Sequence, residues 1–404
     1  MDMNFKRLIG DATRLTRSGD LEAATRAIQR ALGGGAPDDG DATRAERETT
    51  RPGGDGARVI DGEWTRVDAG ADSGGGAPRT GARSDAQPDV RPGARSEPGT
   101  PDHPDTRNGN ASSAPGRVVR ARHTDAKGTL DYRLFVPARA AGAPPPPLLV
   151  MLHGCTQNAD DFAIGTRMDE LARQHGCLVL YPDQSDRANP QRCWNWFKHT
   201  HQRRGGGEAG LIERCVRDIV AEHGADPARV FVAGLSAGGA MAAILGSVCP
   251  DLFAGVGVHS GLAAGAASNL PEALMAMQRG APAGAASTGT LPPTIVFHGD
   301  ADRTVHPDNG ERIVEACTAA AGAGSIAPTV RRQAGEGGAR GGARSGARGW
   351  TQSVHRAANG RMLAEHWSVQ GVAHAWSGGD RRGSYTDAAG PDASREMMRF
   401  FLAL

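Results

Sequence analysis

The sequence predicts an α/β protein in which about eight mostly parallel strands and their flanking helices follow a disordered N-terminal arm. Three observations support this prediction. Apolar runs and helical patterns alternate after about residue 117, as they do in a parallel sheet covered by helices. Aromatic residues are almost absent before that point, since Trp64 is the only one between Phe5 and Tyr132. Finally, a G-x-S-x-G motif joins an expected strand to an expected helix.

The N-terminal arm divides into two parts. Residues 1–33 repeat Leu and Ala at near-helical spacing around a Ser-Gly-Asp interruption, which predicts a short helical hairpin that docks on the next domain or on a partner. Residues 34–116 are rich in Gly, Ala, Arg, Asp, Pro and Ser. Such a low-complexity linker is expected to be disordered, because it buries too little apolar surface to offset the entropy of ordering. Residues 117–404 then form one domain.

Short apolar runs in this domain predict its strands, and apolar helical faces predict two of its helices. The helical faces lie within 211–220 and 241–248. The expected strands are Val118–Arg122, Tyr132–Val136, Leu148–Leu152, Leu178–Tyr181, Val230–Ala233, Gly255–Val258, Thr294–Phe297 and Ala364–Val369.

Charge and cysteine content exclude several functions. The 46 Lys and Arg nearly balance the 45 Asp and Glu, so no net field favours nucleic acid or an anionic membrane. The 6 cysteines fit no zinc or C-x-x-C spacing, and most are expected to be buried apolar fillers, so no metal is predicted. No apolar run is long enough to span a membrane. The Arg-Gly tract at Gly338–Gly349 is interpreted as a loop insertion without a function.

The G-x-S-x-G motif is formed by Gly234, Ser236 and Gly238. It follows an apolar strand-like run and opens into an Ala- and Met-rich helix. A serine at such a strained turn exposes its hydroxyl, while small residues two positions before and after avoid backbone collisions. The sequence therefore predicts Ser236 as a catalytic nucleophile.

In an α/β-hydrolase, which this order of elements predicts, an acid and then a histidine follow the serine, each on a loop after a strand. Asp302 is favoured as the acid over Asp300, which comes directly after Gly299 and is expected to make local turn hydrogen bonds. His374 is favoured as the base, because it lies in a small-residue loop after the last strand. Three other histidines lie in a nearby turn, beside the Arg-Gly tract or within a strand-like run: His306, His355 and His366.

Two backbone N–H groups are expected to form the oxyanion hole. Ala237 supplies the first, since it follows the nucleophile. Cys155 is expected to supply the second, because Gly154 lets the backbone turn sharply just before it. Cys155 also has an alternative structural role, paired with another cysteine, and the sequence leaves this open.

Several segments together resemble the poly(3-hydroxybutyrate) (PHB) depolymerase family of α/β-hydrolase esterases. The resemblance covers about residues 117–404 and, more weakly, the N-terminal hairpin. The similar segments are Leu152–Asn158, Tyr181–Ser185, Arg192–Phe197, Gly234–Met241, Val258–Leu262 and Ala373–Gly379. The family implies a serine carboxylic-ester hydrolase with Ser236, Asp302 and His374 as its triad and Cys155 at the oxyanion hole. It implies no metal and no organic cofactor.

The resemblance leaves the substrate open among hydroxyalkanoate oligomers or polymers and small acyl or aryl esters, including feruloyl and acetylxylan esters. A non-catalytic polymer-granule binding protein is the alternative from another class. Trp194, Trp196 and Trp376 lie near the expected active loops and are predicted to line the substrate pocket, with ordinary packing as the alternative. The family implies an extracellular location, whereas the absence of a readable Sec signal peptide favours the cytoplasm.

Overall fold

A computed structural model describes residues 116–282, 291–320, 328–334 and 346–404. The predicted hairpin, nearly all of the predicted linker and most of the Arg-Gly tract lie outside these described residues. All of the described residues belong to one compact unit.

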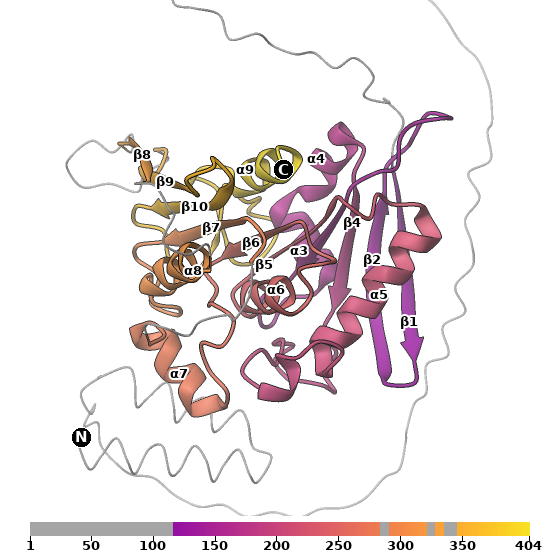
Figure 1. The fold of residues 1–404 in the computed structure, drawn as a ribbon, viewed down its shortest axis with the longest axis horizontal. Coiled ribbons are helices and arrows are strands. Elements are labelled where there is room, and N and C mark those ends of the chain that lie inside the picture. Colours follow the sequence, from indigo (N-terminus) through magenta and orange to yellow (C-terminus); the bar gives the residue numbers. More distant parts are fainter. Residues whose placement is uncertain (1–115, 283–290, 321–327, 335–345) are drawn as a thin grey trace, which may run out of the picture. The chain divides into compact units, whose positions relative to one another are not determined.

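A large mixed sheet runs through this unit, and Figure 1 shows its strands side by side. Its strands lie in the order β1-β2-β4-β3-β5-β6-β7-β10-β9-β8. All eight predicted strands are present. The strands are β1 (Arg117–Asp125), β2 (Gly128–Val136), β3 (Leu148–Leu152), β4 (Leu178–Asp183), β5 (Val230–Leu235), β6 (Gly255–His259), β7 (Thr294–Gly299), β8 (Thr329–Gln333), β9 (Trp350–Arg356) and β10 (Met362–Val369).

The centre of the sheet is parallel, and its two edges are antiparallel. Strands β4, β3, β5, β6, β7 and β10 pair in parallel, whereas β1 and β2 at one edge and β9 and β8 at the other pair antiparallel. The sequence did not predict the edge strand β8 or its neighbour β9, because both are polar and every residue of β8 is exposed. It also missed a small parallel pair, β11 (Trp376–Ser377) with β12 (Thr386–Asp387).

Helices cover both faces of the sheet, and Figure 1 shows α5, α6 and α8 together on one side. The helices are α3 (Ala159–Thr166), α4 (Met168–His175), α5 (Gly207–His223), α6 (Ala237–Val248), α7 (Leu270–Arg279), α8 (Asp308–Ala319) and α9 (Ala393–Leu402), with a 3₁₀ turn η1 at His199–His201. The two predicted helical faces belong to α5 and α6, and both helices bury these faces in the core.

The core has one cluster on each face of the sheet, because alternate strand residues point in opposite directions. In β3, Leu148, Val150 and Leu152 pack with α5, α6 and α8, whereas Leu149 and Met151 pack with α3, α4 and α9. All five side chains are buried. Double-sided burial fixes the register of the central strands and hence the positions of the loops at their carboxyl ends, where ligands bind in α/β sheets.

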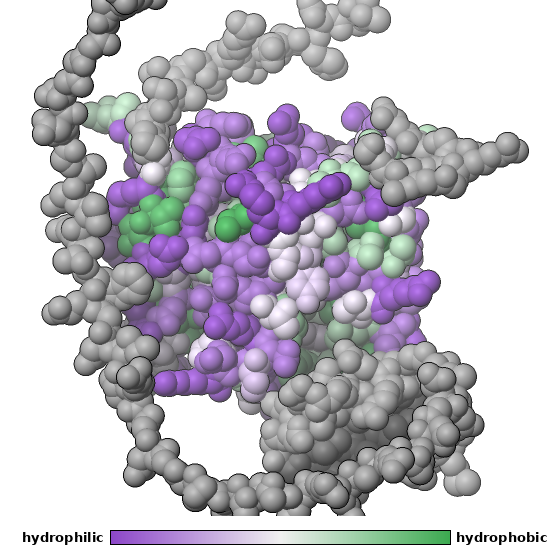
Figure 2. Space-filling view, turned by 180° about the vertical axis from the view of Figure 1, so that it is seen from behind, coloured by the Kyte–Doolittle hydropathy of each residue, from purple (hydrophilic) through white to green (hydrophobic). Residues whose placement is uncertain are grey.

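The surface shows no large apolar region on the face drawn in Figure 2. That face is mainly hydrophilic, and its hydrophobic residues form small, separate patches. Among the residues that the structure describes, the helices are too short or too polar to cross a membrane.

Candidate active site

Ser236 lies at the turn between β5 and α6, and its backbone is strained. Its φ of 58° and ψ of −119° fall outside the regions that a serine normally adopts. The backbone N–H of Ser236 donates a 2.9 Å hydrogen bond to the carbonyl oxygen of His259, at the end of the neighbouring strand β6. This contact holds the strained conformation, which presents the serine side chain at the start of a helix.

Close backbone contacts explain the two glycines of the motif. A Cβ atom on Gly234 would lie 2.4 Å from the carbonyl carbon of Gly238, and one on Gly238 would lie 2.1 Å from the carbonyl oxygen of Leu152. Both distances are far below van der Waals contact. Only glycine therefore allows β5, the start of α6 and the end of β3 to meet around Ser236.

The start of α6 offers hydrogen-bond donors. Ser236 is the N-cap residue, and the first intrahelical bond runs from the N–H of Ala240 to the carbonyl oxygen of Ser236. The N–H of Ala237 precedes this bond, so it has no partner within the helix. It lies at the positive end of the helix dipole, where negative charge is stabilised.

The structure brings His374 and Asp302 together from loops 72 residues apart. The Nδ1 atom of His374 lies 2.7 Å from Oδ2 of Asp302. Because a carboxylate only accepts, Nδ1 carries the proton, and Nε2 of His374 is left with a free lone pair. The His374 side chain is 11% exposed, whereas the Asp302 side chain is fully buried.

The Asp302 carboxylate is held in its ionised form by its surroundings. Oδ1 accepts hydrogen bonds of 2.9 Å from the backbone N–H groups of Thr304 and Val305. Burial alone would raise the pKa of Asp302, but hydrogen bonds from His298 and His374 and the charge of His374 together lower that pKa well below its usual range. A permanently charged, fixed carboxylate orients an imidazole and stabilises its protonated form.

The alternative acid and bases have different surroundings. Asp300 is exposed, and its Oδ1 accepts a 2.6 Å hydrogen bond from the N–H of Gly371, which lies 71 residues away and is not the local turn contact that the sequence predicted. The other three candidate histidines form no hydrogen bond or ion pair with Asp302. His306 bonds to the backbone at the start of α8, His355 lies in β9, and His366 is partly buried in β10.

His259 is a fully buried histidine that connects the two sides of the site. Its carbonyl accepts from Ser236, and its Nε2 accepts a 2.9 Å hydrogen bond from the N–H of Ser377, three residues after His374. The ring stacks on Trp376 at 5.0 Å and on Phe297 at 5.7 Å. Burial lowers the pKa of His259 to about 3, so the ring stays neutral at working pH. His259 lies in the segment Val258–Leu262, which resembles the PHB depolymerase family, but the sequence suggested no role for it.

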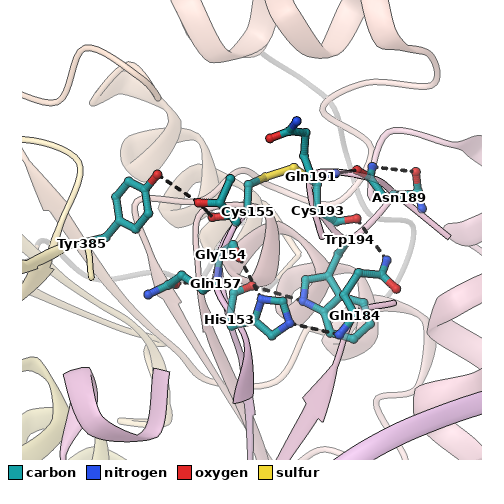
Figure 3. The surroundings of a disulfide bond; sticks show 12 residues. His153, Gly154, Cys155, Gln157, Gln184, Asn189, Gln191, Cys193, Trp194 and Tyr385 are labelled. Atoms are coloured by element: carbon teal, nitrogen blue, oxygen red, sulfur yellow. Dashed lines mark hydrogen bonds between the residues drawn. A yellow bond between two sulfur atoms is a disulfide. The ribbon is translucent and has the colours of Figure 1, made fainter. Parts of the chain in front are cut away.

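The segment 152–158 runs from β3 to α3 and is tied to a second loop by a disulfide bond. Cys155 is bonded to Cys193, the pairing that the sequence left open, and Thr156 donates its N–H to the carbonyl of Gln191 at 2.7 Å. Figure 3 shows these two loops side by side. The four remaining cysteines are free and buried, as predicted. In the described residues, no protein oxygen accepts a hydrogen bond from the N–H of Cys155.

The sharp turn in this segment is made by Thr156 instead of Gly154, which corrects the reason given from the sequence. Thr156 has a φ of 65°, and Gly154 does not adopt a positive φ. Gly154 is instead a place of close approach, since a Cβ atom there would lie 3.1 Å from Oε1 of Gln157 and 3.6 Å from Cβ of Ser236. Its own N–H donates to Gln157 Oε1 at 2.9 Å. The loop thus lies against the serine turn.

The disulfide-bonded loop is anchored by a buried carboxylate on α5. Glu208 accepts hydrogen bonds from Nε2 of Gln184 at 2.7 Å and from the N–H of Asn195 at 2.6 Å. Burial opposes the ionisation of Glu208, but hydrogen bonds from His201, Asn195 and Gln184 lower its pKa below the usual range. Gln184 also donates to the carbonyl of Cys193 at 3.0 Å. The network fixes the loop that holds Cys155 in place.

The three tryptophans predicted to line the pocket are buried. Trp194, Trp196 and Trp376 are 0%, 5% and 1% exposed. The indole N–H of Trp194 donates to the carbonyl of His153, and that of Trp376 donates to Oγ of Ser394. Their surroundings favour the packing role, in which they support the loops on either side of the site.

Tyr385 is a residue near the site that sequence reasoning missed. Its side chain is 45% exposed, and its ring centre lies 6.5 Å from that of His374. Its hydroxyl lies 3.1 Å from Oγ1 of Thr156. No motif surrounds it, and its hydroxyl contacts Thr156, which lies 229 residues away in the sequence, so the sequence carried no signal for it.

No group of three or more His, Cys, Asp or Glu side chains among the described residues is arranged to hold a metal ion.

The fold and the strained serine at the carboxyl end of a parallel strand define an α/β-hydrolase. The chain belongs to the family described as Esterase PHB depolymerase, whose sequence model matches residues 130–340, more than half of the 404 residues.

Relatives in this family carry more than one kind of name. Poly(3-hydroxyalkanoate) depolymerase C of Paucimonas lemoignei is 32% identical over 240 residues, which cover 56% of this chain and 54% of the relative. A probable acetylxylan esterase A of Neosartorya fischeri is 30% identical over 233 residues, covering 49% and 61%. The chain thus spans about half the length of the curated depolymerases that it matches.

A solved structure shares the fold. The acetyl xylan esterase from Aspergillus awamori aligns with a TM-score of 0.53 and 21% identity, over 72% of this chain and 100% of the other. At this identity the similarity concerns the fold alone.

Proposed function

We propose that this protein is a serine carboxylic-ester hydrolase that works through an acyl-enzyme, with Ser236, His374 and Asp302 as its catalytic triad. The observation that carries the proposal is the 2.7 Å contact between His374 and Asp302 in a fold that presents Ser236 at a strained strand-to-helix turn. Each of the three residues comes from a loop at the carboxyl end of a strand, in the chain order expected for α/β-hydrolases.

In the first half of the reaction, Nε2 of His374 removes the proton of the Ser236 hydroxyl as Oγ attacks the ester carbonyl carbon. The tetrahedral intermediate then collapses, and the imidazolium gives that proton to the leaving alcohol. In the second half, His374 deprotonates a water that attacks the acyl-enzyme, and the acid leaves as Ser236 is reprotonated. Asp302 remains a carboxylate throughout and holds Nδ1–H of His374.

The N–H groups of Ala237 and Cys155 are proposed to bind the oxyanion. Neither N–H is consumed by a hydrogen bond to another described residue. Both are held by structure that does not need to rearrange during the reaction, because one begins α6 and the other is fixed by the disulfide bond. Preorganised donors of this kind stabilise a developing negative charge strongly.

The substrate class proposed is an ester of a hydroxyalkanoate, as an oligomer or polymer, with small acyl or aryl esters as the alternative. The family and the depolymerase relatives support the first, and the relatives named acetylxylan esterases support the second. A panel of p-nitrophenyl esters, feruloyl esters and hydroxybutyrate oligomers separates them. Turnover of the oligomers at rates above those of the other esters supports the first class, and activity confined to acetyl or feruloyl esters contradicts it.

We also propose the domain division at residue 117, with a helical hairpin at 1–33 and a linker at 34–116. The nucleophile, acid, base and oxyanion residues all fall between Cys155 and His374. A chain that lacks residues 1–115 is therefore expected to fold and to hydrolyse small soluble esters at nearly the full rate. An equal loss of activity on p-nitrophenyl butyrate and on polymer, in a truncated protein shown to be folded by circular dichroism, would place the boundary elsewhere.

A further inference from the structure

Tyr385 is an exposed aromatic side chain between two parts of the proposed active site. Its ring meets the His374 ring edge to face, with centroids 6.5 Å apart at 78°. Its hydroxyl reaches Thr156, which directly follows Cys155. Nearly half of Tyr385 stays open to solvent, in contrast to the buried Trp376, whose N–H bonds to the Tyr385 carbonyl. An exposed aromatic ring bordering both the base and the oxyanion loop is positioned to touch a bound ester.

The direction of the hydrogen bonds at Tyr385 follows from the number of protons available. The hydroxyl of Thr156 donates to the carbonyl of Cys155 at 2.6 Å, so its single proton is used. The 3.1 Å contact is therefore a donation from Tyr385 Oη to Thr156 Oγ1. This chain of two bonds ends on Cys155, the residue proposed to bind the oxyanion.

The backbone around Tyr385 is fixed by contacts with both sides of the site. Its carbonyl accepts a 2.7 Å hydrogen bond from the N–H of Trp376, two residues after His374. The preceding residue, Ser384, accepts a 3.1 Å hydrogen bond from Gln157 through its carbonyl. Tyr385 itself has a φ of 52°, a conformation that is rare for a bulky residue and that persists only where surrounding contacts enforce it.

We propose that the Tyr385 ring is a specificity-determining surface for the alcohol part of the ester. The reasoning rests on the proposed function: the base that protonates the leaving alcohol must reach the alcohol oxygen, so groups beside the His374 ring face that part of the substrate. An exposed phenol ring offers an apolar face that packs against an aromatic, cyclic or branched alcohol but gains little from a short one. Tyr385 therefore favours esters of bulky apolar alcohols.

The test compares two acetate esters that share the acyl group. The value of kcat/KM is measured for benzyl acetate and ethyl acetate by pH-stat titration, in wild type, Tyr385→Phe and Tyr385→Ala. Loss of the ring in Tyr385→Ala should lower the ratio of kcat/KM for benzyl acetate to kcat/KM for ethyl acetate about tenfold. Tyr385→Phe keeps the ring, so its ratio should stay within about twofold of wild type, while kcat falls modestly on both esters because the hydrogen bond toward Cys155 is lost.

Further measurements separate this role from a structural one. Thr156→Val breaks the same hydrogen-bond chain from the other end, so it should match Tyr385→Phe. The ratio of kcat/KM for p-nitrophenyl butyrate to kcat/KM for p-nitrophenyl acetate reports on recognition of the acyl group. This ratio should not change in Tyr385→Ala. An equal loss on both acetates, or a change in the acyl ratio instead, would overturn the assignment of Tyr385 while leaving the esterase proposal standing. A folded wild type without any esterase activity would overturn both.

Discussion

The serine side and the histidine side of the site are held in place by different kinds of contact. Around Ser236, the backbones of β3, β5 and α6 touch directly, and two glycines are needed for this approach. Around His374, irregular loops are fixed by side chains: the Asp302 carboxylate, the His259 ring and the hydroxyl of Tyr385. The first arrangement depends on close backbone contacts around one short motif, whereas the second depends on single side chains that are far apart in the sequence.

Because of this difference, some substitutions should remove a reacting group, whereas others should only displace one. The largest expected effect comes from the reacting groups themselves. Ser236→Ala or His374→Ala should each lower kcat about 10⁶-fold, since either change abolishes the acyl-enzyme route. The double variant should lose little more, because the two residues act as one unit. Steady-state kinetics on p-nitrophenyl butyrate measures both effects, and additive losses would contradict the triad.

The next largest effect separates the two aspartates after β7. Asp302→Asn should lower kcat about 10⁴-fold, because an amide does not stabilise the imidazolium and favours the wrong tautomer. Asp300→Asn is the matched control, since the exposed Asp300 only accepts from the N–H of Gly371, and its kcat should stay close to wild type. A greater loss in Asp300→Asn than in Asp302→Asn, with both proteins folded, would assign the acid to Asp300.

A smaller effect is expected from the disulfide bond, which only holds the segment with Cys155 in its position. Cys193→Ser should lower the free energy of unfolding by about 3 kcal/mol and should lower kcat with little change in KM, since it frees the segment that carries Cys155. The matched control is Cys215→Ser, which changes a free, buried cysteine on α5. Wild type in reductant should resemble Cys193→Ser. Unchanged kcat in the folded Cys193→Ser variant would show that the disulfide does not position the oxyanion loop.

The same comparison explains which strands and which site residues could be predicted from the sequence. The central strands and Ser236 have local signals, because double-sided burial produces continuous apolar runs and the serine turn requires glycines at fixed positions. Asp302 and His374 were chosen by chain order, and the structure brings these two side chains together. The edge strand β8 and its neighbour β9 left no apolar run. The roles of His259, Glu208 and Tyr385 depend on contacts between distant segments, for which a single sequence holds no pattern.

The last expected effect concerns stability at acidic pH and not the rate of catalysis. Burial lowers the pKa of His259 to about 3 and of His366 to about 4, below the ordinary value of 6.5. Below pH 6.5 the unfolded chain binds protons that the folded chain does not, so stability should fall as the pH drops from 6.5 toward 4. Each histidine contributes up to about 1.4 kcal/mol per pH unit.

Thermal unfolding between pH 4 and pH 7 measures this effect. His366→Gln should flatten the decrease in Tm, because it removes one group that resists protonation in the fold. The exposed His306 provides the matched control, and His306→Gln should leave the slope unchanged. If Tm falls as steeply with decreasing pH in His366→Gln as in wild type, the burial of His366 does not govern the loss of stability in acid.

The central claim is that Ser236 is an activated nucleophile held by its strained turn, and active-site labelling tests it most directly. The protein is treated with a fluorophosphonate, which modifies only activated serines, and the labelled peptide is identified by mass spectrometry. We expect a single phosphonylated residue, Ser236, with no labelling in Ser236→Ala and strongly reduced labelling in His374→Ala. A folded wild type that takes up no label, or that takes it up at another serine, would contradict the account.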